Sequence, residues 1–152
     1  MKRGLFLPAA LLFAVLLSFS PTSAQRSSSG DLVGLTANGF SLEQAYVNPF
    51  NPETHIPFVL GKDLFGEDRP VRVTIQVVDL LQQFVATPTT IAGSPIGEGI
   101  PVEDLEFGDP GRYEVVWDGK NLKGAKVASG TYFVRLRVGD LTRVMKVFFP
   151  GQ

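Results

Sequence analysis

Few side chains in this 152-residue chain are of the kinds that carry out reactions, and they lie far apart in the sequence. Asp79 and Asp118 each follow a run in which apolar residues alternate. Two carboxylates brought together at strand ends could act as a general acid and base. The alternative is that each aspartate caps the turn ending its own strand. We favour capping, because no further candidate acid or base accompanies them.

His55 is the only histidine, and the chain contains no cysteine. A metal site or an activated nucleophile needs a second side chain of such a kind beside it. The sequence therefore predicts no catalytic residue, no metal ligand and no enzymatic activity.

Carboxylates are most concentrated in the stretch 83–111, where they are Glu98, Glu103, Asp104, Glu106 and Asp109. Oxygen ligands in a flexible loop 98–109 could hold Ca²⁺. The alternative is a solvated acidic loop, which we favour because the spacing matches no calcium-binding motif. No cofactor is predicted. Because loops carry specificity on rigid scaffolds, a specific ligand would be sought in this stretch.

The elements that must position these residues are strands. Apolar and polar residues alternate over 71–77, 112–117, 131–138 and 142–149, a period typical of half-buried strands. Turn residues separate them, and the glycines and prolines of 83–111 forbid a long regular element. We expect an all-β sandwich of about seven strands, with a core containing Val73, Ile75, Val77, Tyr113, Val115, Trp117, Tyr132, Val134 and Leu136.

Two features concern sheet edges. Pro57 lacks an amide N–H, which suits an edge strand or a bulge better than a central strand. Leu32–Leu35 or Phe40–Tyr46 could add a strand along an edge, either within the molecule or in a neighbour.

The N-terminal stretch Met1–Ala24 has a basic start, an apolar run and a small-residue cleavage site. It predicts a cleaved signal peptide rather than a membrane span. Residues 25–39 are expected to form a flexible linker and 40–152 the folded domain. With no cysteine, the domain can form no disulfide and carry no lipid anchor on a cysteine, so its stability must come from core burial. We expect no transmembrane segment in the mature chain.

The net charge argues against one class of partner. Removal of Lys2 and Arg3 with the signal peptide leaves 14 − 2 = 12 basic and 15 acidic residues, a net charge of 12 − 15 = −3. No basic patch stands out along the sequence, so a nucleic-acid partner is not expected.

Three motifs resemble the immunoglobulin-like domain shared by the flagellar hook-capping scaffold protein and the C-terminal sorting domains of type IX secretion cargo. One is Trp117-Asp118-Gly119 followed by Gly124 and Val127–Phe133, and the second is Asn48–Thr54. The third, Val77–Leu81 with Val85–Thr87, departs from the pattern because Gln82-Gln83 replaces the usual Gly-Arg. The resemblance covers about Ala45 to the C-terminus and implies an immunoglobulin-like β-sandwich.

The resemblance implies a sorting signal or structural component of the periplasm, cell surface or extracellular medium. Its partner would be outer-membrane secretion machinery or another envelope protein. A role as the flagellar scaffold itself is disfavoured, because that protein is exported without a cleaved signal. Only some twenty residues separate Ala24 from the domain, which favours a free-standing component over cargo delivery. The alternative is an extracellular binding or assembly module, such as an adhesin or polymer subunit. The oligomeric state is left open.

Overall fold

The computed structural model describes residues 39–48, 51–66 and 69–151, with only the backbone of 51 and 52. All of these belong to the compact unit Asp31–Gln152. The predicted signal peptide 1–24, most of the predicted linker 25–39 and the strand considered at Leu32–Leu35 lie outside the described residues.

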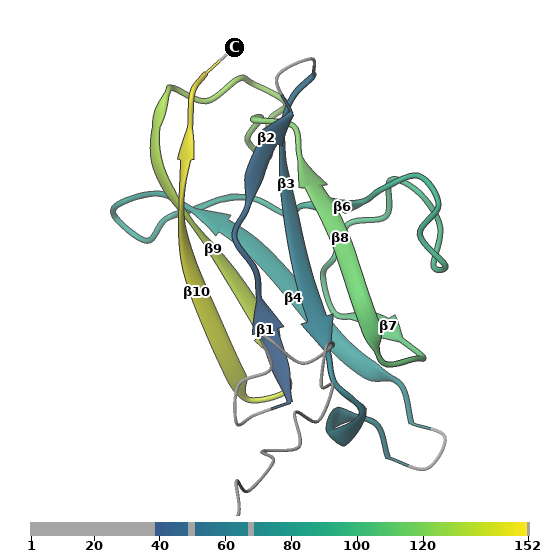
Figure 1. Ribbon diagram of the computed structural model, residues 1–152. Helices are drawn as coiled ribbons and strands as arrows, with labels where there is room; N and C mark the ends of the chain where they lie inside the picture. The colour runs from purple at the N-terminus through teal and green to yellow at the C-terminus, as the bar shows by residue number, and fades with distance from the viewer. Residues whose placement is uncertain (1–38, 49–50, 67–68, 152) are drawn as a thin grey trace, which may run out of the picture. The chain divides into compact units, whose positions relative to one another are not determined.

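The described chain is almost entirely β-structure (Figure 1). Its elements are β1 (Phe40–Leu42), β2 (Tyr46–Asn48), β3 (Asn51–Leu60), the 3-10 helix η1 (Lys62–Leu64), β4 (Val71–Val78), β5 (Phe84–Ala86), β6 (Thr89–Thr90), β7 (Leu105–Phe107), β8 (Gly111–Trp117), β9 (Gly130–Val138) and β10 (Leu141–Phe149).

The strands form two antiparallel sheets packed face to face. The first sheet has the order β1–β3–β8–β6, with β2 also paired to β3. The second has the order β10–β9–β4–β5, with β7 also paired to β4. The predicted all-β sandwich is confirmed. The ten strands of the described residues exceed the expected seven or so partly because two edge positions are each divided between two short strands, β1 with β2 and β5 with β7.

The core lies between the inward faces of the two sheets. Of the nine predicted core residues, eight are buried, and Tyr113 is partly buried against the cluster. Tyr113 stays nearer the surface because its hydroxyl donates a hydrogen bond to the backbone oxygen of Asp109, 2.6 Å away. Buried residues that the prediction omitted include Phe40, Ile56, Phe58, Val102, Phe107 and Phe149.

Pro57 lies in a central strand, not in the edge strand that its missing N–H favours. β3 has β1 and β2 on one side and β8 on the other. The backbone oxygen of Pro57 accepts a hydrogen bond from the Glu43 N–H at 3.0 Å, so its nitrogen also faces the β1–β2 edge. There the strand is interrupted: Leu42 pairs with Phe58 and Tyr46 with His55, so four residue steps oppose three. This bulge accommodates the absent donor.

The open edges of the two sheets meet where β1 contacts β10. Arg143 occupies an inward-facing position of β10, with its guanidinium carbon 5.5 Å from the centroid of the Phe40 ring. A cation held over an aromatic face stabilises this closure. An inward-pointing charge also makes the β10 edge less suited to pairing with another chain.

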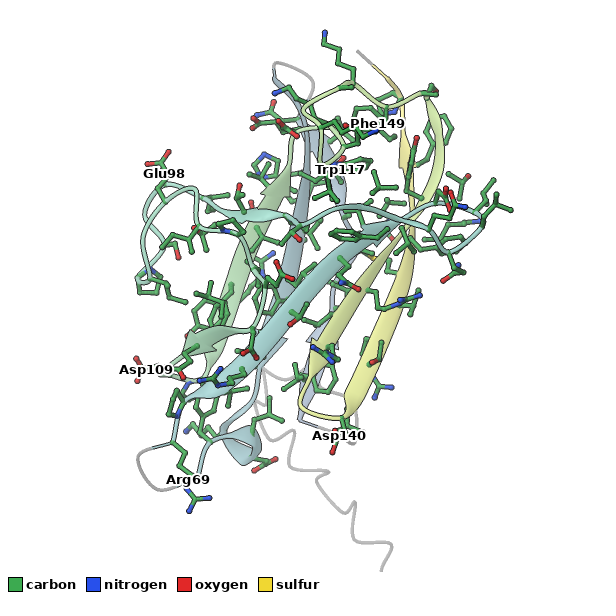
Figure 2. All side chains as sticks on the ribbon, turned by 180° about the vertical axis from the view of Figure 1, so that it is seen from behind. Arg69, Glu98, Asp109, Trp117, Asp140 and Phe149 are labelled. Atoms are coloured by element: carbon green, nitrogen blue, oxygen red, sulfur yellow. The ribbon has the colours of Figure 1, made fainter. Side chains whose placement is uncertain are left out.

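Trp117 lies at the centre of an aromatic cluster near one end of the sandwich (Figure 2). Its ring centroid is 5.1 Å from that of Tyr132 and 5.0 Å from that of Phe149. Its indole N–H donates to the backbone oxygen of Lys120 at 2.9 Å. Burial and the satisfied donor together explain why a tryptophan is accommodated here.

We expect Trp117→Ala to lower the free energy of unfolding by about 3–5 kcal/mol, because it leaves a large cavity and an unpaired Lys120 carbonyl. Denaturant unfolding measures the effect. Phe148→Ala is the control, because that side chain is 65% exposed and a surface change of this kind alters stability by about 0.5 kcal/mol or less. Similar losses in the two variants would contradict the central placement of Trp117.

Gly119 and Gly124 provide a second test of the packing around Trp117. Both have a left-handed backbone, with φ of +70° and +75°. A Cβ at Gly119 would collide with the Phe149 ring, whereas a Cβ at Gly124 would meet nothing within 4 Å. Alanine at Gly124 should cost about 1–2 kcal/mol from backbone strain alone. At Gly119 the cost should be larger by about 1–3 kcal/mol from overpacking. Equal losses on denaturant unfolding would refute the close contact with Phe149.

Candidate functional site

Asp79 caps the turn between β4 and β5. Its Oδ1 accepts hydrogen bonds from the backbone N–H groups of Leu81 and Gln83, at 2.8 and 2.9 Å. The carboxylate thus satisfies donors that the turn would otherwise leave unpaired.

Asp118 has the same role at the end of β8. Its Oδ1 accepts from the Lys120 backbone N–H at 3.0 Å, and its Oδ2 forms an ion pair with Lys120 Nζ at 2.6 Å. This pairing raises the pKa of Lys120, first through the hydrogen bond and then through the charge of Asp118. The predicted capping is therefore confirmed for both aspartates.

The carboxylates of the acidic stretch are divided among different contacts. Asp104 and Glu106 both form ion pairs with Arg72, at 2.5 and 2.6 Å, and their hydrogen bonds and charges raise the Arg72 pKa. Glu103 lines a cleft together with Asp118. Across the described part of the chain, no three His, Asp or Glu side chains are grouped so that they could hold a metal ion.

The connection between β5 and β8 is tied to both sheets rather than projecting freely. The backbone of Val102 donates to Pro88 and accepts from Ile75, at 3.0 and 2.8 Å, and its side chain is fully buried. The Thr90 hydroxyl accepts from the Ile100 N–H at 2.9 Å. As predicted, the connection contains no long element, since β6 and β7 span two and three residues.

A cleft of about 690 Å³ lies where this connection meets the loop after Trp117. Its lining combines carboxylates of Glu53, Glu103 and Asp118 with hydroxyls of Thr87 and Thr89. Its size falls in the range of small-molecule sites, and its polar groups are suited to hydrogen bonding. The stretch 83–111 thus contributes residues to a cleft, and ligand binding there stays a prediction.

A second polar cluster covers the outer face of the first sheet. Glu114 Oε1 is 2.6 Å from His55 Nδ1 and accepts a hydrogen bond from the Tyr46 hydroxyl at 2.9 Å. The rings of Tyr46 and His55 stack with centroids 5.0 Å apart. Arg112 approaches Glu114 Oε2 at 3.9 Å and bonds Glu43 at 3.0 Å. The one histidine therefore has a hydrogen-bond partner on a neighbouring strand.

Sequence reasoning missed this cluster. Tyr46, His55 and Glu114 lie on three different strands, and only the register Tyr46↔His55 and Pro57↔Glu114 brings them together. The sequence does show that Arg112, Glu114 and Val116 alternate with inward-facing residues and so share the outer face of one strand. This alternation does not show which residues of neighbouring strands lie beside them.

No family model matches the chain, and no curated protein matches it. In the described ranges, no helix combines the length and apolar character needed to span a membrane.

The pKa values of all three tyrosines are raised above the ordinary value of 10.0. For Tyr46 the main cause is the hydrogen bond to Glu114, which would be lost on ionisation. For Tyr113 and Tyr132 the main cause is burial, followed by the charges of Asp109 and Asp79 respectively.

This pattern predicts a loss of stability in alkali. The folded state holds its tyrosine protons more tightly than the unfolded state, so stability is fully present below pH 10 and falls as pH rises beyond it. Phenolate absorbance should therefore rise at higher pH in the native protein than in the protein unfolded in urea. Glu114→Gln should move part of the native titration to lower pH. Coincident native and unfolded titrations would contradict the raised pKa values.

Proposed function

We propose that the chain is an exported, non-enzymatic module of the cell envelope or cell surface, immunoglobulin-like in fold, which acts as a sorting signal or structural component. The main support for the proposal is that the two most specific motifs of the sequence lie side by side in the fold. Thr54, from the upstream motif, is the cross-strand neighbour of Trp117, from the downstream motif. Residues far apart in sequence thus form one structural unit, as expected if both motifs belong to the same kind of domain.

Strand order supports the immunoglobulin-like assignment. Strands A to G of such a sandwich can be matched in chain order to β1 with β2, then β3, β4, β6, β8, β9 and β10. The sheets A-B-E-D and C-F-G correspond to β1–β3–β8–β6 and β4–β9–β10. β5 adds the C′ position, and β7 is an addition beside β4.

A tyrosine at the corner between β8 and β9 is a second support. The Tyr132 hydroxyl donates to the backbone oxygen of Ala128, 2.8 Å away and four residues upstream. A tyrosine near the start of strand F that bonds back in this way is a recurrent feature of immunoglobulin-like sandwiches.

Gln82 departs from the resembled pattern in residue type, but its backbone conformation is one that the usual glycine would adopt. Gln82 has φ of +63°, in the left-handed region that glycine enters without strain. The resembled domains have glycine at this point, so the chain keeps the backbone while changing the residue. The Gln82 side chain accepts a hydrogen bond from Arg135 at 2.8 Å, which helps to hold the turn.

The alternative is an extracellular binding module, and the cleft of about 690 Å³ favours it. A soluble ligand of an exported protein could bind there with the Glu53, Glu103 and Asp118 carboxylates as acceptors. An exported protein could bind such a ligand, so export alone does not distinguish the two functions. The sorting role requires in addition that the outward surface of β10 contact a receptor.

The test is to fractionate the producing cells and to identify by mass spectrometry where the chain resides. Under the sorting role we expect the chain at the surface, accessible to added protease, or in the medium. The double variant Val144→Ser/Phe148→Ser should then be retained in the periplasm, because both side chains are more than half exposed on β10, where receptor contacts would form.

Leu122→Ser serves as the matched control, since Leu122 is 69% exposed but lies outside β10. Export of the control with retention of the double variant supports sorting through β10. A wild-type chain confined to the periplasm contradicts the sorting role and leaves the structural one.

A further inference from the structure

The outer face of the second sheet gathers positive charge that is not evident along the sequence. Strands β4, β9 and β10 contain no acidic residue and five basic ones, namely Arg72, Arg135, Arg137, Arg143 and Lys146. The chain as a whole has more acidic than basic residues. Alternation along each strand separates the cations in sequence, and pairing of the strands brings them together.

Three of these cations remain available on the outer face. Arg72 is neutralised by Asp104 and Glu106, and Arg143 is on the inward side beside Phe40. Arg135 bonds the uncharged side chain of Gln82. Arg137 and Lys146 form no ion pair with any described residue. Asp140, in the exposed turn between β9 and β10, is the nearest acidic residue along these strands.

The strand register arranges polar side chains around the two outward arginines. Arg137 lies between Thr142 and Thr74, and Arg135 between Val144 and Gln76. Cross-strand neighbours of this kind lie about 5 Å apart. Thr74, Gln76, Arg135, Arg137 and Thr142 together line a groove of about 320 Å³.

Some acidic residues lie away from the groove, whereas Asp104, whose backbone N–H bonds the groove residue Thr74, and Asp140, in the adjoining turn, lie near it. Figure 2 shows Glu98 and Asp109 on the side opposite the hairpin β9–β10. A partner with negative charges would be attracted to the cations of the groove that have no acidic partner and repelled from the side that contains Glu98 and Asp109.

We propose that this groove binds a carboxylate-bearing polysaccharide. The guanidinium groups of Arg135 and Arg137 present forked donors that match carboxylates. The Thr142 hydroxyl and the Gln76 amide beside them can donate to and accept from sugar hydroxyls. Val144, which is 55% exposed on the outward side of β10, is the cross-strand neighbour of Arg135 and adds an apolar side chain beside the groove.

An acidic peptide fits this groove less well. Peptides that bind sheets usually do so by adding a strand at an edge, where backbone groups are unpaired. The groove lies over β4, β9 and β10, and in it only side chains face outward; β9, at its centre, is paired on both sides. Recognition must therefore come from side-chain donors, which suits a polymer rich in hydroxyls and carboxylates.

The experiment measures binding of polygalacturonate to the chain recovered from the producing cells, by calorimetry at physiological ionic strength. We expect binding that weakens with salt and is absent for the fully methyl-esterified polymer, which has the same sugars without charge. Arg137→Gln should weaken binding roughly tenfold or more, as loss of a charged hydrogen bond predicts. Arg137→Lys should keep part of the affinity.

Arg69→Gln is the matched control, since it removes the same charge from an exposed residue that is not among those lining the groove. It should leave binding unchanged, and denaturant unfolding should show that both arginine variants are folded. Absence of binding, equal binding of the esterified polymer, or equal effects of the two variants would overturn the proposal. Binding of poly-glutamate or single-stranded DNA as tightly as polygalacturonate would also overturn the proposal, since binding would then depend only on general charge attraction.

Export of the chain would bring the groove into contact with such polymers. Binding and location are measured separately, so the binding proposal and the export proposal can each fail alone.

Discussion

The packing of Phe149 against Trp117 and Gly119 is the contact on which the rest of the sandwich depends. It joins the last strand of the second sheet to the turn that ends β8 in the first. The aromatic rings exclude water from that end of the core, and the indole N–H fixes the following loop through the Lys120 carbonyl. The absence of a Cβ at Gly119 allows the ring to approach the backbone directly. A buried aromatic cluster of this kind is what a domain without disulfides needs, since apolar burial must then outweigh the entropy of folding.

The same contact determines what surrounds it. With the Trp117–Gly119 turn held in place, Asp118 is positioned to cap its loop, and the cleft lined by Glu53 and Glu103 forms beside it. The first sheet then presents Tyr46, His55 and Glu114 outward, while the second presents its arginines. Each sheet contributes its inward residues to one core, so its outward residues are free to differ in chemistry. The two outer faces accordingly carry a carboxylate-centred cluster on one side and a cationic groove on the other.

Sequence reasoning reached the strands and most of the core, because alternation reports which side of a strand a residue occupies. Val73, Ile75 and Val134 are buried as their period requires. It did not predict the burial of Val102 or Phe107, which lie in a stretch rich in glycine and proline. Both are buried because β7 and the backbone of Val102 pair with β4. Both outer-face clusters were missed for the corresponding reason. The neighbours of His55 and of Arg137 are decided by register between strands, which no single strand encodes.

The bulge opposite Pro57 also has a consequence for how the edge of the first sheet finds its register. A shift of the β1–β2 segment along β3 would place a regularly paired residue opposite a nitrogen that has no hydrogen to donate, leaving its carbonyl unpaired. A shift by a single residue would also turn Phe40 out of the core. Pro57 thus favours the observed alignment of the edge segment with β3, in which the chain bulges opposite the missing donor and Phe40 is buried.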